Sequence, residues 1–165
     1  MLNVNLSVEL RGKYQAVRDV ANAVQEIALR KALDLTPGTL DGSADLLFMD
    51  TRTLAASGTE DLDLAGGLTD AFGASLTMVE VVALLISAAP GNTNNVLVGG
   101  AASNAWGALF GATNDVLVLK PGASMMLFCD KGYAVTAGTG DLLKIANSAG
   151  STGVTYTIAV IGRSA

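Results

Sequence analysis

The amino-acid sequence predicts a mainly β fold: an antiparallel β-sandwich or jelly roll with one short amphipathic helix near the N-terminus. Two observations indicate the β class. Short apolar stretches follow one another at intervals of about 8–12 residues, which is the spacing of strands in sandwich folds. Glycine, proline and asparagine, which favour turns, stand between these stretches. The 165 residues are expected to form one domain.

The N-terminal segment begins with a strand pattern. Residues 3–10, NVNLSVEL, alternate strictly between polar and apolar side chains, so the apolar ones fall on one face of an extended chain. Residues 27–35 also suit a strand, which would run into a Thr-Pro-Gly turn at residues 36–38. We therefore expect strands at both ends of this segment.

Between these two strands the period changes. Apolar residues now recur at spacings of three and four, and charged residues occupy the positions between them. This spacing predicts an amphipathic helix over residues 12–25. Its apolar stripe consists of Tyr14, Val17, Ala21 and Val24.

From residue 45 onward, the sequence predicts strands without helices between them. The last one, residues 154–161, is apolar on one face and nearly so on the other, so it should lie deep in the fold. The stretch TEDLDL at residues 59–64 would point Asp61 and Asp63 to one face, which we expect to be a solvated acidic face rather than a calcium site. The other strands are expected at residues 45–49, 51–55, 77–87, 95–98, 115–119, 124–129, 133–136 and 142–146.

The composition indicates a protein that hides apolar surface against partners. Half of the residues are hydrophobic, whereas only 15% are charged. Exposed apolar patches usually mark interfaces, so we expect much of this surface to lie between subunits. The longest apolar run, VVALLISAAP, has about half of the roughly 20 residues that a membrane-spanning helix needs. Insertion into a membrane is therefore not expected.

The charge distribution argues against nucleic acid as a partner. The formal net charge is −5, and no block of basic residues could follow a phosphate backbone. The charge is also uneven along the chain. Residues 1–35 carry five Lys or Arg against four Asp or Glu, whereas residues 36–165 carry five against eleven. The N-terminal segment is thus chemically distinct from the rest.

Residues that commonly carry catalysis are scarce. Histidine is absent, which removes the commonest general base and the commonest transition-metal ligand. The one cysteine, Cys129, allows neither an internal disulfide nor a structural zinc site within one chain. No nucleophile elbow or phosphate-binding glycine motif occurs, and no spacing nominates a pair of glycosidase carboxylates. We therefore expect no catalytic residue, no metal, no cofactor and no enzymatic activity.

Subunit contact is the role that the residues themselves suggest. The amphipathic stripe can pack onto a neighbouring subunit, or it can cover an open end of its own sandwich, and both alternatives stay open. Trp106 lies beside Leu109 and Phe110, which suits a core or an interface better than a sugar-stacking platform. The candidate interface residues are Tyr14, Val17, Ala21, Val24, Ile27 and Trp106.

Four long phrases of the sequence resemble a family of small structural proteins in the virions of tailed bacteriophages. The phrases fall within residues 45–165, and the resemblance is weaker before residue 45. They are DTRTLAASGTEDLDLAGGLTDAFG, APGNTNNVLVGGAASNAW, VLKPGASMMLFCDKGYAVTAGTGDLLKIANS and VTYTIAVIG.

This resemblance implies a non-enzymatic part of the phage particle, made in the host cytoplasm. Similar proteins include capsid decoration or cement proteins, which bind the shell of major capsid protein on the outer surface of the head and stabilise it. They often form dimers or trimers, so the implied partners are the major capsid protein and other copies of the chain. Residues 1–35 would then be an arm or helix for subunit or capsid contact. The alternative is a glycan-binding host-recognition module on a tail fibre or head fibre.

Overall fold

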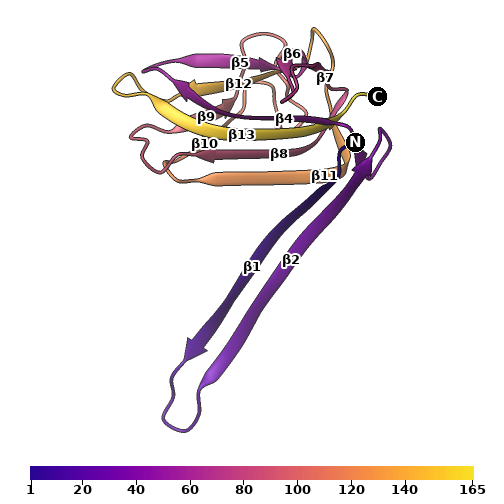
Figure 1. The fold of residues 1–165 in the computed structure, drawn as a ribbon. Helices are drawn as coiled ribbons and strands as arrows, with labels where there is room; N and C mark the ends of the chain where they lie inside the picture. Colours follow the sequence, from indigo (N-terminus) through magenta and orange to yellow (C-terminus); the bar gives the residue numbers. More distant parts are fainter.

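The computed structural model describes residues 1–165 and contains thirteen strands and no helix. A β-sandwich forms the body, and a long two-stranded ribbon projects from one end of it (Figure 1). The strands are β1 (Val4–Ala16), β2 (Ala23–Pro37), β3 (Ser43–Ala44), β4 (Leu46–Leu54), β5 (Thr59–Asp63), β6 (Ala65–Thr69), β7 (Ser75–Thr77), β8 (Glu80–Ala88), β9 (Val96–Gly99), β10 (Val116–Leu119), β11 (Ser124–Ala134), β12 (Leu142–Asn147) and β13 (Val154–Arg163).

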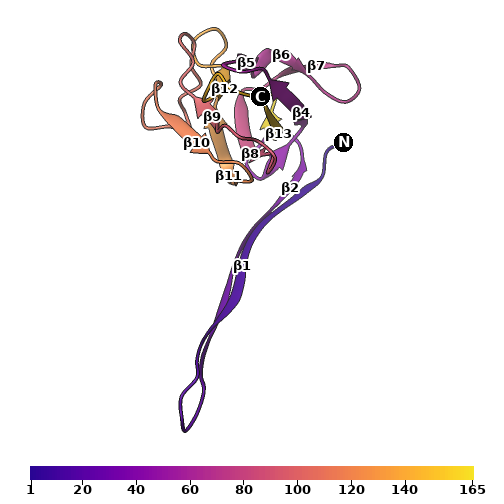
Figure 2. The same ribbon diagram turned by 90° about the vertical axis from the view of Figure 1, so that its left-hand side faces the viewer.

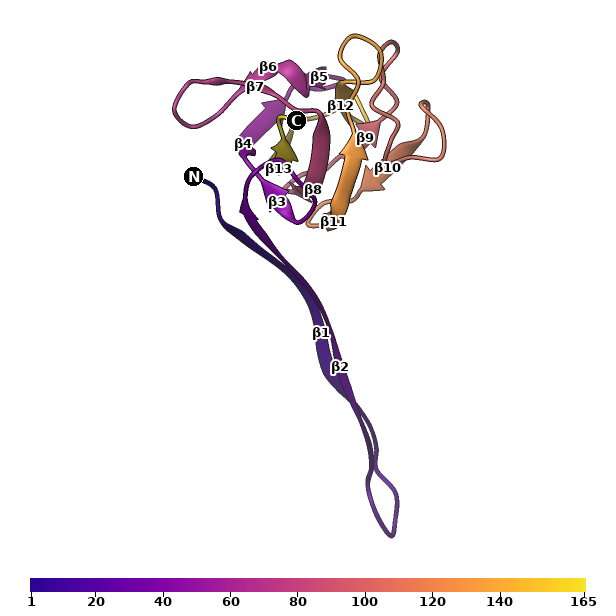
Figure 3. The ribbon, with the colours of Figure 1, turned by 90° about the vertical axis from the view of Figure 1, so that its right-hand side faces the viewer.

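Two four-stranded antiparallel sheets make up the body. One has the strand order β10-β9-β12-β5 and the other the order β11-β8-β13-β4. A small hairpin of β6 and β7 lies at one side, and the ribbon consists of β1 paired with β2 (Figure 2). The ribbon meets the body near the end where β3 lies (Figure 3).

The strands of the body pair in a nested order. The first, β4, pairs with the last, β13, and the second, β5, pairs with β12. Inside these, β8 pairs with β11 and β9 pairs with β10. The body is therefore one long hairpin folded over on itself, and two further pairings, β8 with β13 and β9 with β12, complete the sheets.

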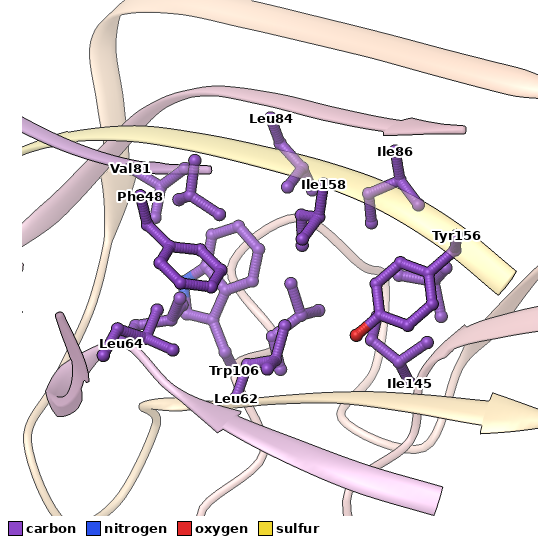
Figure 4. Packing of buried hydrophobic residues seen from close by; sticks show 14 of the residues in the cluster. Phe48, Leu62, Leu64, Val81, Leu84, Ile86, Trp106, Ile145, Tyr156 and Ile158 are labelled. Atoms are coloured by element: carbon purple, nitrogen blue, oxygen red, sulfur yellow. The ribbon is translucent and has the colours of Figure 1, made fainter. Parts of the chain in front are cut away.

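The hydrophobic core fills the space between the two sheets (Figure 4). Strand β13 runs through its centre, as its two apolar faces predict, with β8 on one side and β4 on the other. Tyr156 and Ile158 of β13 point into this core and are fully buried. They pack with side chains of both sheets, among them Phe48, Leu62 and Ile145.

Most of the strands expected from the sequence are confirmed. Residues 45–49 and 51–55 belong to the single strand β4, and residues 124–129 and 133–136 belong to the bulged strand β11. The stretch TEDLDL forms β5, with Leu62 buried and Asp61 exposed. The remaining five strands, β8, β9, β10, β12 and β13, match their expected positions to within three residues at either end.

The helix expected over residues 12–25 is wrong. These residues form the ends of β1 and β2 and the loop 17–22 between them, and the pairing of the two strands runs without a break from Val4 with Leu35 to Ala16 with Ala23. An isolated helix of this length is marginal in water, whereas the ribbon pairs its backbone groups across the two strands. The apolar residues Tyr14, Val17, Ala21 and Val24 come from the end of one strand, the loop and the start of the next strand. Their spacing of three and four residues therefore does not reflect a helix.

A buried arginine holds the junction between ribbon and body. The side chain of Arg163, near the C-terminus, is 1% exposed, and its Nη2 lies 2.5 Å from Oε2 of Glu80. Its Nη1 lies 3.4 Å from Oδ1 of Asp41, which belongs to the loop after β2, and Lys131 also pairs with Asp41. The pKa of Asp41 is lowered, chiefly by the hydrogen bond from Lys131. These contacts fix the loop through which the ribbon joins the sandwich.

Substitution of Glu80 should destabilise the fold. Glu80→Ala removes one partner of a buried guanidinium, which costs roughly 3–5 kcal/mol in proteins, and we expect about 3 kcal/mol because Glu80 is partly exposed. Asp61→Ala, on the exposed face of β5, serves as the control and should change the free energy of unfolding by less than about 0.5 kcal/mol. Urea denaturation measures both, and equal effects would contradict the role given to the junction.

Candidate interaction surfaces

The ribbon has one apolar face. Residues that stand directly opposite each other in an antiparallel pair point to the same side, and here the opposed pairs include Leu6 with Leu33 and Leu10 with Leu29. Alternate residues of both strands therefore place their apolar side chains together. The apolar residues of this face are Val4, Leu6, Val8, Leu10, Tyr14, Ile27, Leu29, Leu33 and Leu35. The face also carries two polar residues, Lys31 opposite Val8 and Gln25 opposite Tyr14.

The opposite face of the ribbon is polar and charged. Lys13 and Glu26, which are opposed across the two strands, form an ion pair at 3.1 Å. Arg11 pairs with Glu9 along the same strand, in an exposed position. A face of this kind is stable in water, so the ribbon is amphipathic along its whole length. The polar face carries Asn5, Ser7, Glu9, Arg11, Lys13, Gln15, Glu26, Arg30 and Asp34.

Only the base of the apolar face is covered by the chain itself. Leu6 is 7% exposed, and together with Leu35 it packs against Val82, Ala83 and Ile161 of the sandwich. Further along the ribbon, Leu10 is 57% exposed, Leu29 66% and Tyr14 72%. The ribbon diverges from the body over this part (Figure 1), so its distal apolar face has no partner within the chain.

The ribbon base lies on the outer face of the sheet β11-β8-β13-β4. This face has rows of side chains that run across the four strands. The row nearest the ribbon is apolar and belongs to the cluster that the ribbon base covers. It consists of Leu47, Ile161, Ala83 and Phe128.

The next row of the same face is also apolar, but the chain leaves it partly uncovered. Met49 of β4 is exposed and so is Leu85 of β8, whereas Ala159 and Met126 are half-buried. These four residues are neighbours across the sheet in the order Met49, Ala159, Leu85 and Met126. We call them the second apolar row.

Beyond the second apolar row, the outer face becomes a surface of hydroxyl groups. Thr51 and Thr157 are hydrogen-bonded at 2.9 Å, and Ser87 and Ser124 are hydrogen-bonded at 2.7 Å. Thr53 and Thr155 repeat this arrangement at 2.9 Å. These hydroxyls satisfy one another and remain accessible to water. The exposed apolar part of the sheet is therefore confined to the end from which the ribbon projects.

A groove of about 450 Å³ adjoins the second apolar row. It lies between the N-terminus, strand β4 and the β6–β7 hairpin, and Leu2, Met49 and Phe72 are among its lining residues. Asp45 and Asp70 give it two carboxylates. Because Met49 lines the groove and also begins the second apolar row, the two form one continuous apolar surface.

The structure does not gather the predicted interface residues into one stripe. Tyr14 and Ile27 lie on the apolar face of the ribbon, whereas Val24 stands opposite Gln15 on the other face. Val17 and Ala21 lie in the loop between the strands.

Trp106 lies in the core rather than on the surface. It is 2% exposed, and its indole Nε1 donates a hydrogen bond of 2.9 Å to the carbonyl oxygen of Ala134. Of the two places suggested by its apolar neighbours, the core is the one that it occupies, so Trp106 offers no surface to a subunit or a sugar.

The exposed residues Val8, Leu10 and Leu29 were missed as interface candidates. The signal for them was present, because the strict alternation of residues 3–10 and the strand pattern of residues 27–35 place their apolar side chains on one face if the two segments pair. The second apolar row has no such local signal, since its four residues come from four separate strands.

A partly buried polar cluster closes the open side of the sandwich between β4 and β5. The Tyr156 hydroxyl donates to Oε1 of Glu60 at 2.7 Å, and Arg52 donates from Nη1 to Oε2 of Glu60 at 2.5 Å. Arg52 also donates from Nε to Asp50 at 3.0 Å. Burial, and then the hydrogen bond to Glu60, raises the pKa of Tyr156 far above its ordinary value. The pKa of Arg52 is also raised, since Glu60 outweighs the opposing effect of burial.

This cluster joins strands of both sheets and acts as a structural clamp. It contains carboxylates, but no group of three or more Asp, Glu, His or Cys residues in the structure is arranged to hold a metal ion. The guanidinium of Arg52 also lies 5.5 Å from the centre of the Phe48 ring, which adds a cation–π contact. The Tyr156 hydroxyl, both carboxylate oxygens of Glu60, and Nε and Nη1 of Arg52 are thus all directed at other residues of the chain.

Tyr156→Phe should alter how stability depends on pH in alkaline solution. Below a pH of about 10, Tyr156 is protonated in the folded and unfolded states alike. Above the ordinary pKa of 10.0, it ionises when unfolded but stays protonated when folded, so the free energy of unfolding falls as pH rises. The fall between about pH 10 and 11 should be steeper in the unsubstituted protein than in Tyr156→Phe. Urea denaturation across this range measures it, and parallel curves would contradict the prediction.

The geometry described above is the main guide to function. The chain forms no helix with the length and hydrophobicity of a membrane span. Comparisons with protein-family models, with curated proteins and with solved structures give no match to this chain. Its relationship to phage virion proteins is therefore a proposal.

Proposed function

We propose that this chain is a non-enzymatic structural protein of a tailed-phage virion, a capsid decoration or cement protein. In this role it binds the shell of major capsid protein and stabilises the head. We assign its sandwich to the jelly-roll class, because the nested pairing of eight body strands is the order that jelly rolls use. Jelly rolls are common in viral capsid proteins, although lectins and other proteins also use them.

The ribbon is the observation that carries the proposal. Its apolar face remains uncovered from Val8 outward, and it reaches beyond the body of the domain (Figure 3). A face of this kind is unfavourable in water unless another molecule covers it. A subunit that works within an assembly provides such a cover, which suits a decoration protein.

The mechanism would be mass action. A protein that binds the assembled shell but not its dissociated parts stabilises the shell by its binding free energy. Many copies, each bound weakly, would together resist the outward pressure of packaged DNA through multivalency. The body, with five basic and eleven acidic residues in 36–165, would present a negative, hydrated surface to the outside.

The fibre module remains the alternative, since lectin domains also use jelly rolls. A glycan-binding surface would be expected to present aromatic side chains to the sugar rings. Most exposed residues of the ribbon and of the second apolar row are aliphatic or Met, and Trp106 lies in the core. The exposed aromatics are Tyr14 on the ribbon and Phe72 in the adjoining groove, and they are separate rather than gathered into one sugar-stacking platform. These observations favour contact with protein over contact with glycan.

Locating the chain in purified phage particles tests the proposal. Electron cryomicroscopy should find copies in the hundreds on the outside of the head. A handful of copies confined to the tail, or to fibres, would replace the decoration role with the fibre role. Absence from the particle would overturn both.

A shortened ribbon should separate folding from attachment. Replacing residues 9–30 by Asn-Gly, a favoured two-residue hairpin turn, keeps the buried base with Leu6, Leu33 and Leu35. The product should fold, with a melting temperature near that of the full chain, but should join capsids more weakly in a co-sedimentation assay, because it has lost the face that joins it to neighbouring subunits of the assembly. Glu9→Gln, on the polar face, is the control and should still join them. Undiminished binding by the shortened protein would contradict a role for the ribbon in attachment.

A further inference from the structure

We propose that the distal apolar face of the ribbon binds the second apolar row of another copy of this chain, so that copies assemble by exchanging ribbons. Each copy would give one ribbon and receive one. The argument uses only the surfaces of this chain, so it does not depend on whether the protein acts on a phage head.

The chain already contains one example of this contact. The base of the ribbon packs Leu6 and Leu35 against Ala83 and Ile161 of the outer face. The second apolar row lies directly beside that contact on the same sheet and offers similar aliphatic groups, with Leu85 at its centre. The distal part of the ribbon offers aliphatic residues like those of its base, among them Val8, Leu10 and Leu29, together with Tyr14. The two uncovered surfaces therefore match in chemistry.

A chain cannot make this second contact with its own ribbon. From Val8 to Ala16 the ribbon continues for nine residue pairs, or roughly 30 Å at about 3.4 Å per residue. Over this length it points away from the sandwich in all three views (Figures 1–3). Only another molecule can cover it.

A second copy satisfies both uncovered surfaces at once. A foreign partner bound to the ribbon would leave the second apolar row exposed, whereas exchange covers the ribbon and the row together. Charge also favours exchange. Residues 1–35 carry one net positive charge and residues 36–165 six net negative charges, so the ribbon of one copy is attracted to the body of another.

The area agrees with a closed oligomer. A two-stranded ribbon is roughly 10 Å wide, so the distal apolar face covers roughly 300 Å². The second apolar row spans roughly 15 Å across its four strands, so a ribbon of this length also covers the groove that continues from Met49. One exchanged ribbon, counted on both surfaces, buries roughly 600 Å², which is below the size of stable interfaces. Two reciprocal contacts in a dimer bury roughly 1,200 Å², the lower limit of the standard range. Closure into a dimer or a ring is therefore required for stability.

The oligomeric state of the purified full chain tests the proposal. Light scattering after size-exclusion chromatography should give the mass of a dimer or trimer. Leu29→Glu, on the distal apolar face, should shift this mass to that of a monomer with an unchanged circular dichroism spectrum, because the side chain is exposed. Ala28→Glu is the matched control: it introduces the same charge one residue away, on the polar face, and should remain oligomeric. A monomeric unsubstituted protein would overturn the proposal.

Cross-linking between differently labelled copies identifies the surfaces. In a Cys129→Ser background, one protein carries Leu10→Cys and the other carries Leu85→Cys. After the two are mixed and allowed to exchange, a short bifunctional thiol reagent should link them into heterodimers. Ala28→Cys in place of Leu10→Cys should give far less product, since it lies on the opposite face. An oligomer that forms without this preference would overturn the assignment of the surfaces.

These measurements use purified protein without capsids. If ribbon exchange fails, the proposed location of the chain in a virion is unaffected and is still tested by microscopy. In the same way, absence from virions would leave the oligomer result intact.

Discussion

At the end where the ribbon attaches, the two central strands of the sheet β11-β8-β13-β4 are apolar on both faces, and the rest of the structure follows from the need to cover them. In β8, every residue from Val81 to Leu84 is buried. Because successive side chains of a strand point to opposite faces, both faces of β8 are removed from water here. The second sheet covers the inner face and forms the main core, whereas the ribbon base covers part of the outer face. A sheet with two apolar faces cannot be stable in water as a two-layer sandwich alone. The base of the ribbon thus forms a third layer on the sandwich, whereas the rest of the ribbon projects away from the body.

The strands of the body were predictable because their signals are local. Alternation, short apolar runs and turn residues identify β4, β5, β9, β12 and β13 without knowledge of their partners. The ribbon was misjudged because its interpretation depends on a pairing. The stripe Tyr14, Val17, Ala21 and Val24 has the spacing of a helix, but the chain reverses direction at residues 17–22 and places these residues on two paired strands and their loop.

The interaction surfaces were less predictable than the fold, for a physical reason. Met49, Ala159, Leu85 and Met126 become neighbours only through the nested pairing of four strands, and no local pattern specifies that pairing. Trp106 shows the reverse case. Its apolar neighbours in sequence suit a core and an interface equally, and only the placement of its indole against the carbonyl of Ala134 decides between them.

The nested order of the strands also determines when each part of the molecule can fold. The ribbon joins neighbouring segments through a short loop, so it can form within microseconds of the emergence of β2 from the ribosome. The body cannot close in this way, since β4 must wait for β13, and the Thr51–Thr157 hydrogen bond spans 106 residues of sequence. Long-range pairing of this kind is slow. During synthesis, the ribbon would therefore form before the sheet exists, with its apolar face exposed. It would be only marginally stable until its base packs on the body, because an isolated two-stranded hairpin has little stability in water. A high local concentration of nascent chains would then let the ribbon of one chain meet the newly closed sheet of another.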